Sequence, residues 1–192
     1  SRNAELVGNE AGLTAYLKLN EGTGEQLIDA TGRGNTGVVR NIYTPGSATI
    51  AGRIDHPGQR DFYTFTLDTA KQLYFDSLTQ NAGMNWTLTG PRGAVVSARS
   101  FTASDSYDFG VGSPVLDLIA GEYTLMIDVP GDQTANYAFR LLDLSLAAVM
   151  TPGTLINSTL TPSRETDLYQ FTATAGERYY FDSFSALGGD MY

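Results

Sequence analysis

Apolar and polar side chains alternate twice within one short stretch of the chain, residues 61–77. Tyr63, Phe65 and Leu67 fall on one side of an extended chain, and Leu73 and Phe75 repeat this set after a short polar break. A period of two, built from aromatic and β-branched residues, is typical of strands that bury one face. The pattern therefore predicts two strands here, each with its aromatic face turned inward.

The same stretch occurs again at residues 167–183, and the two copies align without a gap. The identical positions are Asp61, Tyr63, Phe65, Thr66, Tyr74, Phe75, Asp76 and Ser77 in the first copy and Asp167, Tyr169, Phe171, Thr172, Tyr180, Phe181, Asp182 and Ser183 in the second. A repeat of this kind indicates that a structural unit is duplicated. We therefore expect equivalent residues, such as Phe65 and Phe171, to lie in equivalent environments.

Further short alternating segments surround the first copy and are separated by turn residues. They are residues 50–54, Trp86 with Leu88, Val95 with Val96, residues 115–119, Tyr123 with Leu125 and Ile127, and Tyr137 with Phe139 and Leu141. Residues 90–93, Gly-Pro-Arg-Gly, favour a tight β-turn, because proline suits its second position and glycine its last. Short strands at this spacing, with no convincing helical segment, predict an all-β, antiparallel jelly-roll-type β-sandwich.

Residues 1–40 have a different pattern. Leucine or alanine at 13, 15, 17 and 19 alternates with other side chains, which predicts a strand, and a stretch with five glycines follows. Glycine supplies positive φ at turns, and Asp and Asn side chains bond the local backbone there. We therefore interpret Asp29 and Asn35 as turn-capping residues in preference to ligands of a binding site.

This opening resembles that of a laminin-G-like (concanavalin-type) jelly roll, which often has a strand, Glu-Gly-x-Gly and Asp-x-x-Gly-x-Gly-Asn-x-Gly. The matching residues are Glu21, Gly22, Gly24, Asp29, Gly32, Gly34, Asn35 and Gly37. The rest of such a domain does not follow. The resemblance therefore implies only a local strand-turn-strand within residues 1–43.

Three motifs follow one another in the order Asp-x-Tyr-x-Phe, Trp-x-Leu-x-x-Pro-x-Gly and Ala-Gly-x-Tyr-x-Leu-x-Ile, from Asp61 to Ile127. This order resembles the bacterial pre-peptidase C-terminal domain family, whose members are jelly-roll β-sandwiches appended to secreted proteases and collagenases or repeated along large surface proteins. The resemblance spans residues 44–144 and begins again near Thr151. It implies a complete sandwich at residues 44–146, after a linker at 41–48, and the first half of a second sandwich at 147–192.

A half sandwich leaves apolar faces and unpaired strand edges exposed. We therefore expect residues 149–192 to be completed by another copy, by the first repeat or by sequence outside this chain. The repeat thus predicts a swapped or strand-complemented contact.

Composition excludes several classes of partner and chemistry. The chain has 192 residues and a net charge of -9, so its surface repels phosphate backbones, and nucleic acid is not an expected partner. It has no cysteine, which excludes disulfides, thiol nucleophiles and thiolate metal sites. No apolar run approaches the roughly 20 residues that a membrane span needs.

Four acidic residues are candidate ligands for Ca²⁺. Asp105 and Asp108 lie in a polar loop where carboxylates, hydroxyls and carbonyls could collect around a hard cation. Asp61 and Asp167 hold equivalent positions before an aromatic strand. A structural interpretation is preferred for both pairs, as a solvated loop and as turn acids. The strand-ending Asp76 and its equivalent are expected to face solvent or the sheet end.

Candidates for other chemistry are few. Tyr107, in the same polar loop, could stack on a sugar, whereas Trp86 alternates with Leu88 and is predicted to be core. His56 is the only histidine and lies in a His-Pro-Gly turn. Neither Gly-x-Ser-x-Gly nor His-Glu-x-x-His occurs, so we expect no catalytic residues, no cofactor other than Ca²⁺, and no enzyme activity.

These observations favour a non-catalytic structural or adhesive segment of a large secreted or cell-surface protein. Its expected partners are other copies or adjoining repeats of the same protein, and it could self-assemble into filaments through strand or half-domain complementation. Two alternatives remain. One is a carbohydrate- or fibre-binding module, with or without dependence on Ca²⁺, and the other is the appended domain of a secreted peptidase.

Overall fold

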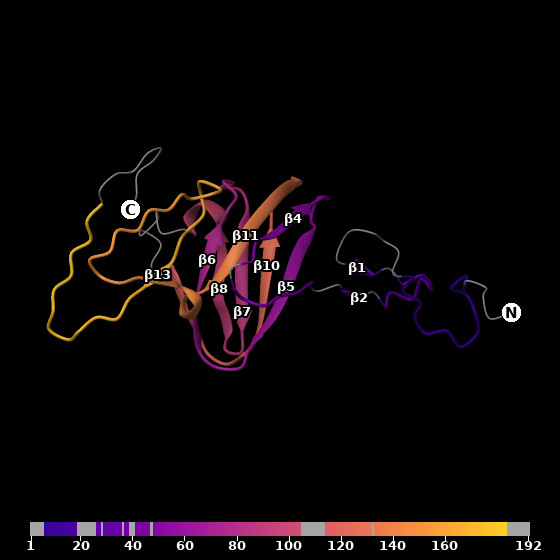
Figure 1. Cartoon of the computed structure of the whole chain (residues 1–192). Coiled ribbons are helices and arrows are strands. Elements are labelled where there is room, and N and C mark those ends of the chain that lie inside the picture. Colours follow the sequence, from indigo (N-terminus) through magenta and orange to yellow (C-terminus); the bar gives the residue numbers. More distant parts are fainter. Residues whose placement is uncertain are drawn as a thin grey trace.

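Figure 1 shows two packed β-sheets with an extended segment on either side, in a computed structural model of the chain. The structure describes residues 6–18, 26–27, 29–35, 37–38, 41–46, 48–104, 114–131 and 133–183. The N-terminal segment leaves one end of the sheets, and the second copy of the repeat leaves the other.

The first sheet has the strand order β3-β5-β10-β7-β8. Its strands are β3 (Asn41–Ile42), β5 (Arg60–Leu67), β10 (Gly121–Asp128), β7 (Asn85–Gly90) and β8 (Gly93–Ser100). β10 runs antiparallel to both β5 and β7, whereas β3 joins β5 in parallel. The predicted Gly-Pro-Arg-Gly turn connects β7 to β8.

The second sheet has the strand order β4-β11-β6-β9 and is antiparallel throughout. Its strands are β4 (Ile50–Ile54), β11 (Ala135–Asp143), β6 (Lys71–Ser77) and β9 (Val115–Leu118). Two 3₁₀ turns, η1 (Phe101–Ala103) and η3 (Leu144–Leu146), are the helical elements of the described chain. No helix among the described residues is long and apolar enough to cross a membrane. The predicted all-β sandwich is confirmed.

Aromatic side chains fill the space between the sheets. Phe75 of β6 lies at the centre, stacked on Trp86 with ring centroids 4.1 Å apart and on Phe139 with centroids 5.0 Å apart, while Phe101 meets it edge-on. On β5 the inner face predicted from the alternation, at positions 63, 65 and 67, is buried. Trp86 is fully buried, as predicted from its alternation with Leu88.

The N-terminal segment differs in part from its prediction. The short strands β1 (Gln26–Leu27) and β2 (Gly37–Val38) pair antiparallel across the glycine-rich stretch. The strand predicted over residues 13–19 is wrong for its described part, where Leu17 makes only an isolated bridge to Asp29. A strand needs a partner ladder, and here the amide of Tyr16 donates instead to the carboxylate of Asp29.

Asp29 caps this turn, as its position in the sequence predicted. Its carboxylate accepts hydrogen bonds from the backbone amides of Tyr16, Thr31 and Asn35 and from the Thr31 hydroxyl. These bonds, led by that from the Tyr16 amide, hold the pKa of Asp29 far below its usual value. The carboxylate therefore stays charged and organises the loop.

Residues 41–48 are not merely a linker. Asn41 and Ile42 form β3, and Tyr43 packs against the core with its hydroxyl accepting a hydrogen bond from the amide of Leu141. The linker prediction rested on the Thr-Pro-Gly sequence that follows, and this sequence does end the strand.

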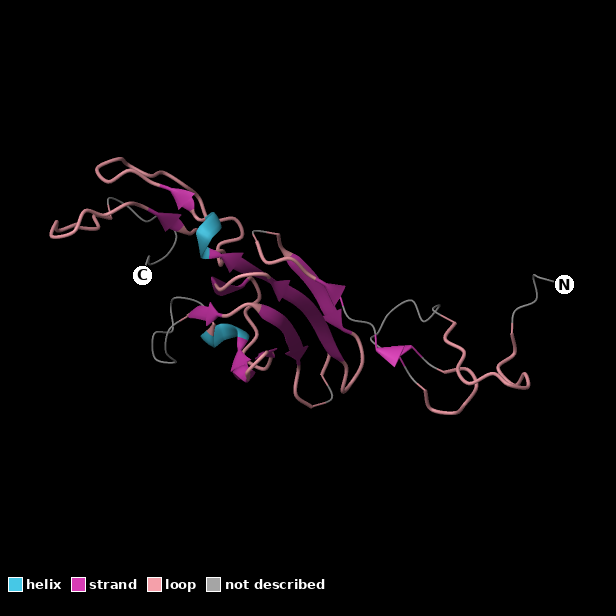
Figure 2. Cartoon of the chain, turned by 90° about the horizontal axis from the view of Figure 1, so that it is seen from below, coloured by secondary structure: helices cyan, strands magenta, loops and turns pink. Residues whose placement is uncertain are grey.

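The second copy does not form a sandwich in this structure. Its strands are β12 (Ala148–Val149) and β13 (Tyr169–Gln170), which pair in parallel, and the other described residues of 150–183 form turns and extended loops (Figure 2). The expectation of equivalent environments is therefore wrong here, since Phe65 is 3% exposed and Phe171 is 44% exposed. Isolated strands without neighbours in a sheet are not stable, which explains the difference.

Candidate functional site

The two copies begin with the same backbone geometry. In the first, the amide of Tyr43 donates to the carbonyl of Thr64 at 2.8 Å, and in the second the amide of Met150 donates to the carbonyl of Gln170 at 2.8 Å. Thr64 and Gln170 are equivalent in the repeat. Thr-Pro-Gly follows in both, at residues 44–46 and 151–153. Each copy therefore begins with a short strand that pairs in parallel with its own β5 or the equivalent of β5: β3 with β5, and β12 with β13.

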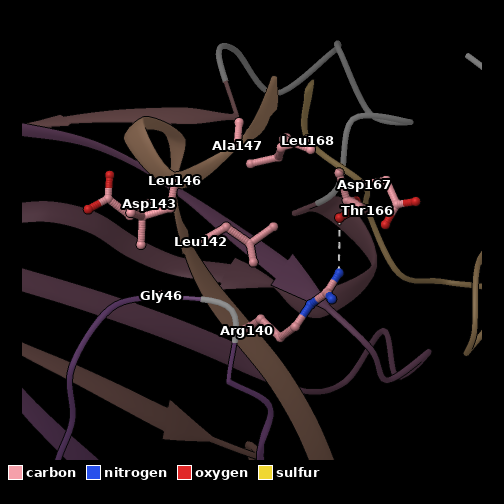
Figure 3. Close-up of a pocket in the computed structure, with 10 residues that line it drawn as sticks. Gly46, Arg140, Leu142, Asp143, Leu146, Ala147, Thr166, Asp167 and Leu168 are labelled. Atoms are coloured by element: carbon pink, nitrogen blue, oxygen red, sulfur yellow. Dashed lines mark hydrogen bonds between the residues drawn. The ribbon is translucent and has the colours of Figure 1, made fainter. Parts of the chain in front are cut away.

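A shallow pocket of about 150 Å³ lies where the second copy meets the first sandwich (Figure 3). β11 and η3 form one side, and residues 166–168 of the second copy form the other. Its lining residues are Gly46, Arg140, Leu142, Asp143, Leu146, Ala147, Ala148, Thr166, Asp167 and Leu168.

Arg140 on β11 connects the two sides of this junction. Its Nε donates to Oδ2 of Asp76 at 2.7 Å, and its Nη2 lies 2.6 Å from the same oxygen. Nη2 also donates to the carbonyl of Thr166 at 3.0 Å, and Nη1 lies 3.6 Å from Oε2 of Glu165. One guanidinium, whose side chain is 12% exposed, therefore contacts both copies. Several donors in a fixed plane suit such a bridge.

Asp76 is the buried partner of this arginine, and its predicted position facing solvent is wrong. The side chain is fully buried because its neighbour across the sheet is Arg140, which lies opposite it in the β6–β11 register. Burial raises the pKa of Asp76 above the usual aspartate value, and the hydrogen bond and charge of Arg140 partly offset this. Its Oδ1 is buried without a hydrogen-bond partner among the described residues.

Asp143 closes the other side of the pocket. Its carboxylate pairs with the ammonium group of Lys71 and accepts hydrogen bonds from the amide and hydroxyl of Ser145, at 2.9 and 2.6 Å. Burial opposes ionisation, but these bonds outweigh it and lower the pKa of Asp143. Asp143 is therefore a charged N-cap of η3, and its carboxylate oxygens bind Lys71 and Ser145.

Asp61, a candidate calcium ligand, belongs to a buried hydrogen-bond network. Its Oδ2 accepts from the hydroxyl of Tyr137, which is 2.7 Å from the hydroxyl of Tyr63, and its Oδ1 accepts from Nε2 of Gln59 at 2.8 Å. Burial, followed by the bonds to Asp61 and Tyr63, raises the pKa of Tyr137 above the usual tyrosine value. In this structure the side chain of Asp61 on β5 is therefore joined to the other sheet through Tyr137 of β11.

Asp167, its equivalent in the second copy, lies half-buried at the rim of the pocket. Oδ2 accepts hydrogen bonds from the hydroxyl of Ser158 at 3.1 Å and from that of Tyr169 at 3.4 Å. Tyr169 corresponds to Tyr63, so part of the Asp61 network recurs. The hydroxyl of Ser158 thus makes to Asp167 the hydrogen bond that the hydroxyl of Tyr137, on β11, makes to Asp61 in the first copy.

The remaining predicted site residues, Asp105, Tyr107 and Asp108, lie outside the described residues. Within the described ranges, no group of three or more His, Asp or Glu side chains could hold a metal ion. Calcium binding therefore stays a prediction for all four acids, as does sugar stacking for Tyr107.

Arg140 was missed from the sequence. It is the one cation in the segment Tyr-Ala-Phe-Arg-Leu-Leu of β11, where it alternates with the buried aromatic residues. This position shows that its side chain leaves the core face, but the partners Asp76 and Thr166 are far away in the chain and carry no local signal.

Comparison with protein-family models and with curated proteins gave no match. Among solved structures, the chain is similar to PliG of Salmonella Typhimurium, a periplasmic lysozyme inhibitor of g-type lysozyme, with 18% identity over 54% of this chain and 97% of that one and a TM-score of 0.41. It is also similar to the pre-peptidase C-terminal domain of a Bacillus anthracis collagenase, with 18% identity, 54% and 94% coverage and a TM-score of 0.39.

A mutant of the Escherichia coli PliG gives 20% identity, coverages of 53% and 97%, and a TM-score of 0.38. These similarities concern about half of the chain.

Proposed function

We propose that this chain is a non-catalytic structural segment of a large secreted or cell-surface protein, in which β-sandwich modules follow one another in tandem. Residues 44–146 are the first module, and residues 147–192 are the first half of the next. The segment acts by holding successive modules in a defined arrangement and by contacts with neighbouring copies.

The contact that carries this proposal is the bridge made by Arg140. If a flexible tether joined two independent modules, residues of the second copy would not contact the first sandwich. Here Thr166 and Glu165 contact Arg140, which forms a buried ion pair with Asp76 in the first sandwich. Charge-assisted hydrogen bonds in a partly desolvated site are stronger than those of exposed groups. The bridge therefore supports a fixed junction instead of a free linker.

The test compares the intact chain with the double variant Asp76→Leu/Arg140→Leu. Replacing both charges avoids leaving one of them buried and unpaired, so the first sandwich is expected to stay folded. The variant is expected to lose ordering of residues 162–168, seen as faster amide exchange and larger nanosecond motion of the second copy by NMR relaxation.

A matched control is Glu177→Gln, which removes a carboxylate from the second copy away from the junction. It is expected to leave the relaxation of residues 162–168 unchanged. Equal mobility of these residues in the intact chain and the double variant would contradict a fixed junction. A hydrolytic turnover abolished by one carboxylate substitution would contradict the non-catalytic assignment.

The alternative of a calcium-dependent carbohydrate- or fibre-binding module rests on Asp105, Tyr107 and Asp108, which the structure does not describe. Calorimetry with and without a chelator tests it directly. The peptidase alternative depends on the parent protein and is tested by the sequence that adjoins this chain.

A further inference from the structure

The second copy exposes the residues that form the core in the first. Counting back and forward from the Asp61–Asp167 match, each apolar side chain that β4, β5 and β6 bury in the core has an exposed equivalent. The core residues Ile54, Tyr63, Phe65, Leu67, Leu73 and Phe75 correspond to Leu160, Tyr169, Phe171, Ala173, Tyr179 and Phe181. At the centre, Phe75 is 1% exposed and Phe181 is 82% exposed. We call this set of second-copy residues the open face.

In the first sandwich two strands cover the equivalent residues. β10 pairs with β5 along its whole length, from Gly121 opposite Leu67 to Asp128 opposite Arg60. β11 lies between β4 and β6, with Phe139 opposite both Ile50 and Ser77. These two strands are consecutive in the sequence and lie in opposite sheets, β10 in the first and β11 in the second. The open face has no such neighbours among the described residues.

We propose that the open face binds two consecutive strands like β10 and β11, the first pairing antiparallel with residues 167–173 and the second lying between residues 156–160 and 179–183. This inference rests on the proposed tandem function and names the partner of the second copy. The occupant is a polypeptide segment of two consecutive strands, one for each sheet, with apolar residues at alternate positions. It has an arginine opposite Asp182, because Arg140 lies opposite the equivalent Asp76.

One position distinguishes the partner of the second copy from β11 itself. Gly52 of β4 lies opposite Tyr137, and a Cβ atom at residue 52 would be 2.3 Å from the tyrosine hydroxyl oxygen and 2.4 Å from Cζ. The equivalent of Gly52 is Ser158, whose hydroxyl already donates to Asp167 as Tyr137 donates to Asp61. A serine at this position would meet a tyrosine placed as Tyr137 is, because even a Cβ atom at residue 52 would do so. The occupant has a residue shorter than tyrosine at this point.

The experiment adds a synthetic peptide with the sequence of residues 121–143 to the intact chain and measures binding by calorimetry. A second peptide carries Tyr137→Leu, which keeps an apolar side chain but removes the atoms that Ser158 would meet. The leucine peptide is expected to bind at least about tenfold more tightly than the tyrosine peptide, the difference that relief of an overpacked contact gives. In the chain variant Ser158→Gly this preference is expected to disappear.

Two matched chain variants locate the binding. Phe171→Asp places a charge on the open face, whereas Thr172→Asp places the same charge on the opposite side of the strand, at the equivalent of the exposed Thr66. The first is expected to abolish binding and the second to retain it. Amide exchange of residues 156–183 is expected to slow on binding, with the first sandwich unchanged.

Binding that survives Phe171→Asp, or no binding of either peptide, would overturn the proposal. Dimerisation of the chain that Phe171→Asp abolishes would also overturn it, because the open face would then take a second copy instead. The junction experiment with Asp76→Leu/Arg140→Leu uses no peptide. A fixed junction without peptide binding would therefore refute this inference while leaving the tandem arrangement intact.

Discussion

The hydroxyl of Tyr137 hydrogen-bonds a buried aspartate side chain, that of Asp61, in this sandwich. Asp61 is nearly buried, and it is kept there by Tyr137, which reaches it from the other sheet and also contacts Tyr63. Burying a carboxyl group without a hydrogen-bond partner costs free energy. The hydroxyl of Tyr137 therefore stabilises the folded state chiefly by satisfying Asp61.

Tyr137→Phe is expected to lower the free energy of unfolding of the first sandwich by about 1–3 kcal/mol, because Asp61 loses a hydrogen bond that it cannot replace in the core. Urea unfolding followed by Trp86 fluorescence measures this change. Tyr180→Phe is the control, since its hydroxyl is on a side chain that is exposed. Equal unfolding midpoints for both variants would show that the bond to Asp61 contributes nothing.

The raised pKa of Tyr137 gives the same residue a pH signature. Tyrosine in the unfolded chain loses its proton near pH 10, whereas Tyr137 in the folded sandwich keeps it. The folded state then binds more protons, so stability is complete below pH 10 and falls as the pH rises above it. The difference in unfolding free energy between the intact chain and Tyr137→Phe is expected to shrink from about pH 8 to about pH 11, in urea titrations at each pH. A constant difference would contradict this account.

At the scale of elements, the strands of the first sandwich could be predicted from alternation alone. β5 and β6 follow the positions of their tyrosine, phenylalanine and leucine residues, because burial on one face needs only a period of two. Their partners could not be predicted. Asp76 is on the same strand as the central Phe75, yet it is buried because β11 brings Arg140 opposite it.

The second copy shows the limit of the same argument. Residues 167–183 have the alternation of β5 and β6, but an alternating segment becomes a strand only when it has neighbours to bond. The candidate site was predicted only in part. Asp61 and Asp167 were identified as equivalent structural acids, whereas Arg140 and the Tyr137 hydroxyl act on residues too distant in the sequence to be recognised.

Phe75→Ala and Phe181→Ala form a pair that measures this difference between copies. Phe75 contacts three aromatic rings, so its truncation is expected to cost about 3–5 kcal/mol of unfolding free energy. Phe181 is equivalent in sequence but exposed, and its truncation is expected to change the stability of the first sandwich by less than about 0.5 kcal/mol. Thermal and urea unfolding of both variants tests this, and similar losses would mean that the second copy is packed in solution.

At the scale of the whole molecule, ordered and extended parts are clearly separated. Figures 1 and 2 show the two sheets at the centre, with long loops of the second copy beyond them. Local stability follows this division, since exposed backbone without ladder bonds opens at little cost in free energy.

Limited trypsin digestion is expected to cut after Arg178, in the exposed part of the second copy, before it cuts within residues 60–143. The product that keeps the first sandwich is expected to melt at the same temperature as the intact chain, as measured by circular dichroism. Mass spectrometry identifies the order of cuts. Early cleavage after Arg99, on β8, would contradict the stability of the central sheets.

The bridge at Arg140 also gives a row of modules a direction. The cation lies at the downstream end of the first sandwich, and the groups that receive it, Glu165 and Thr166, lie at the upstream end of the second. Such a head-to-tail contact joins two different surfaces, as heterologous interfaces do. In the first copy the position of Glu165 is taken by Gln59, a neutral amide that is bound to Asp61. The first copy therefore lacks the acid that the second copy presents to Arg140, so the two copies are not interchangeable at this contact.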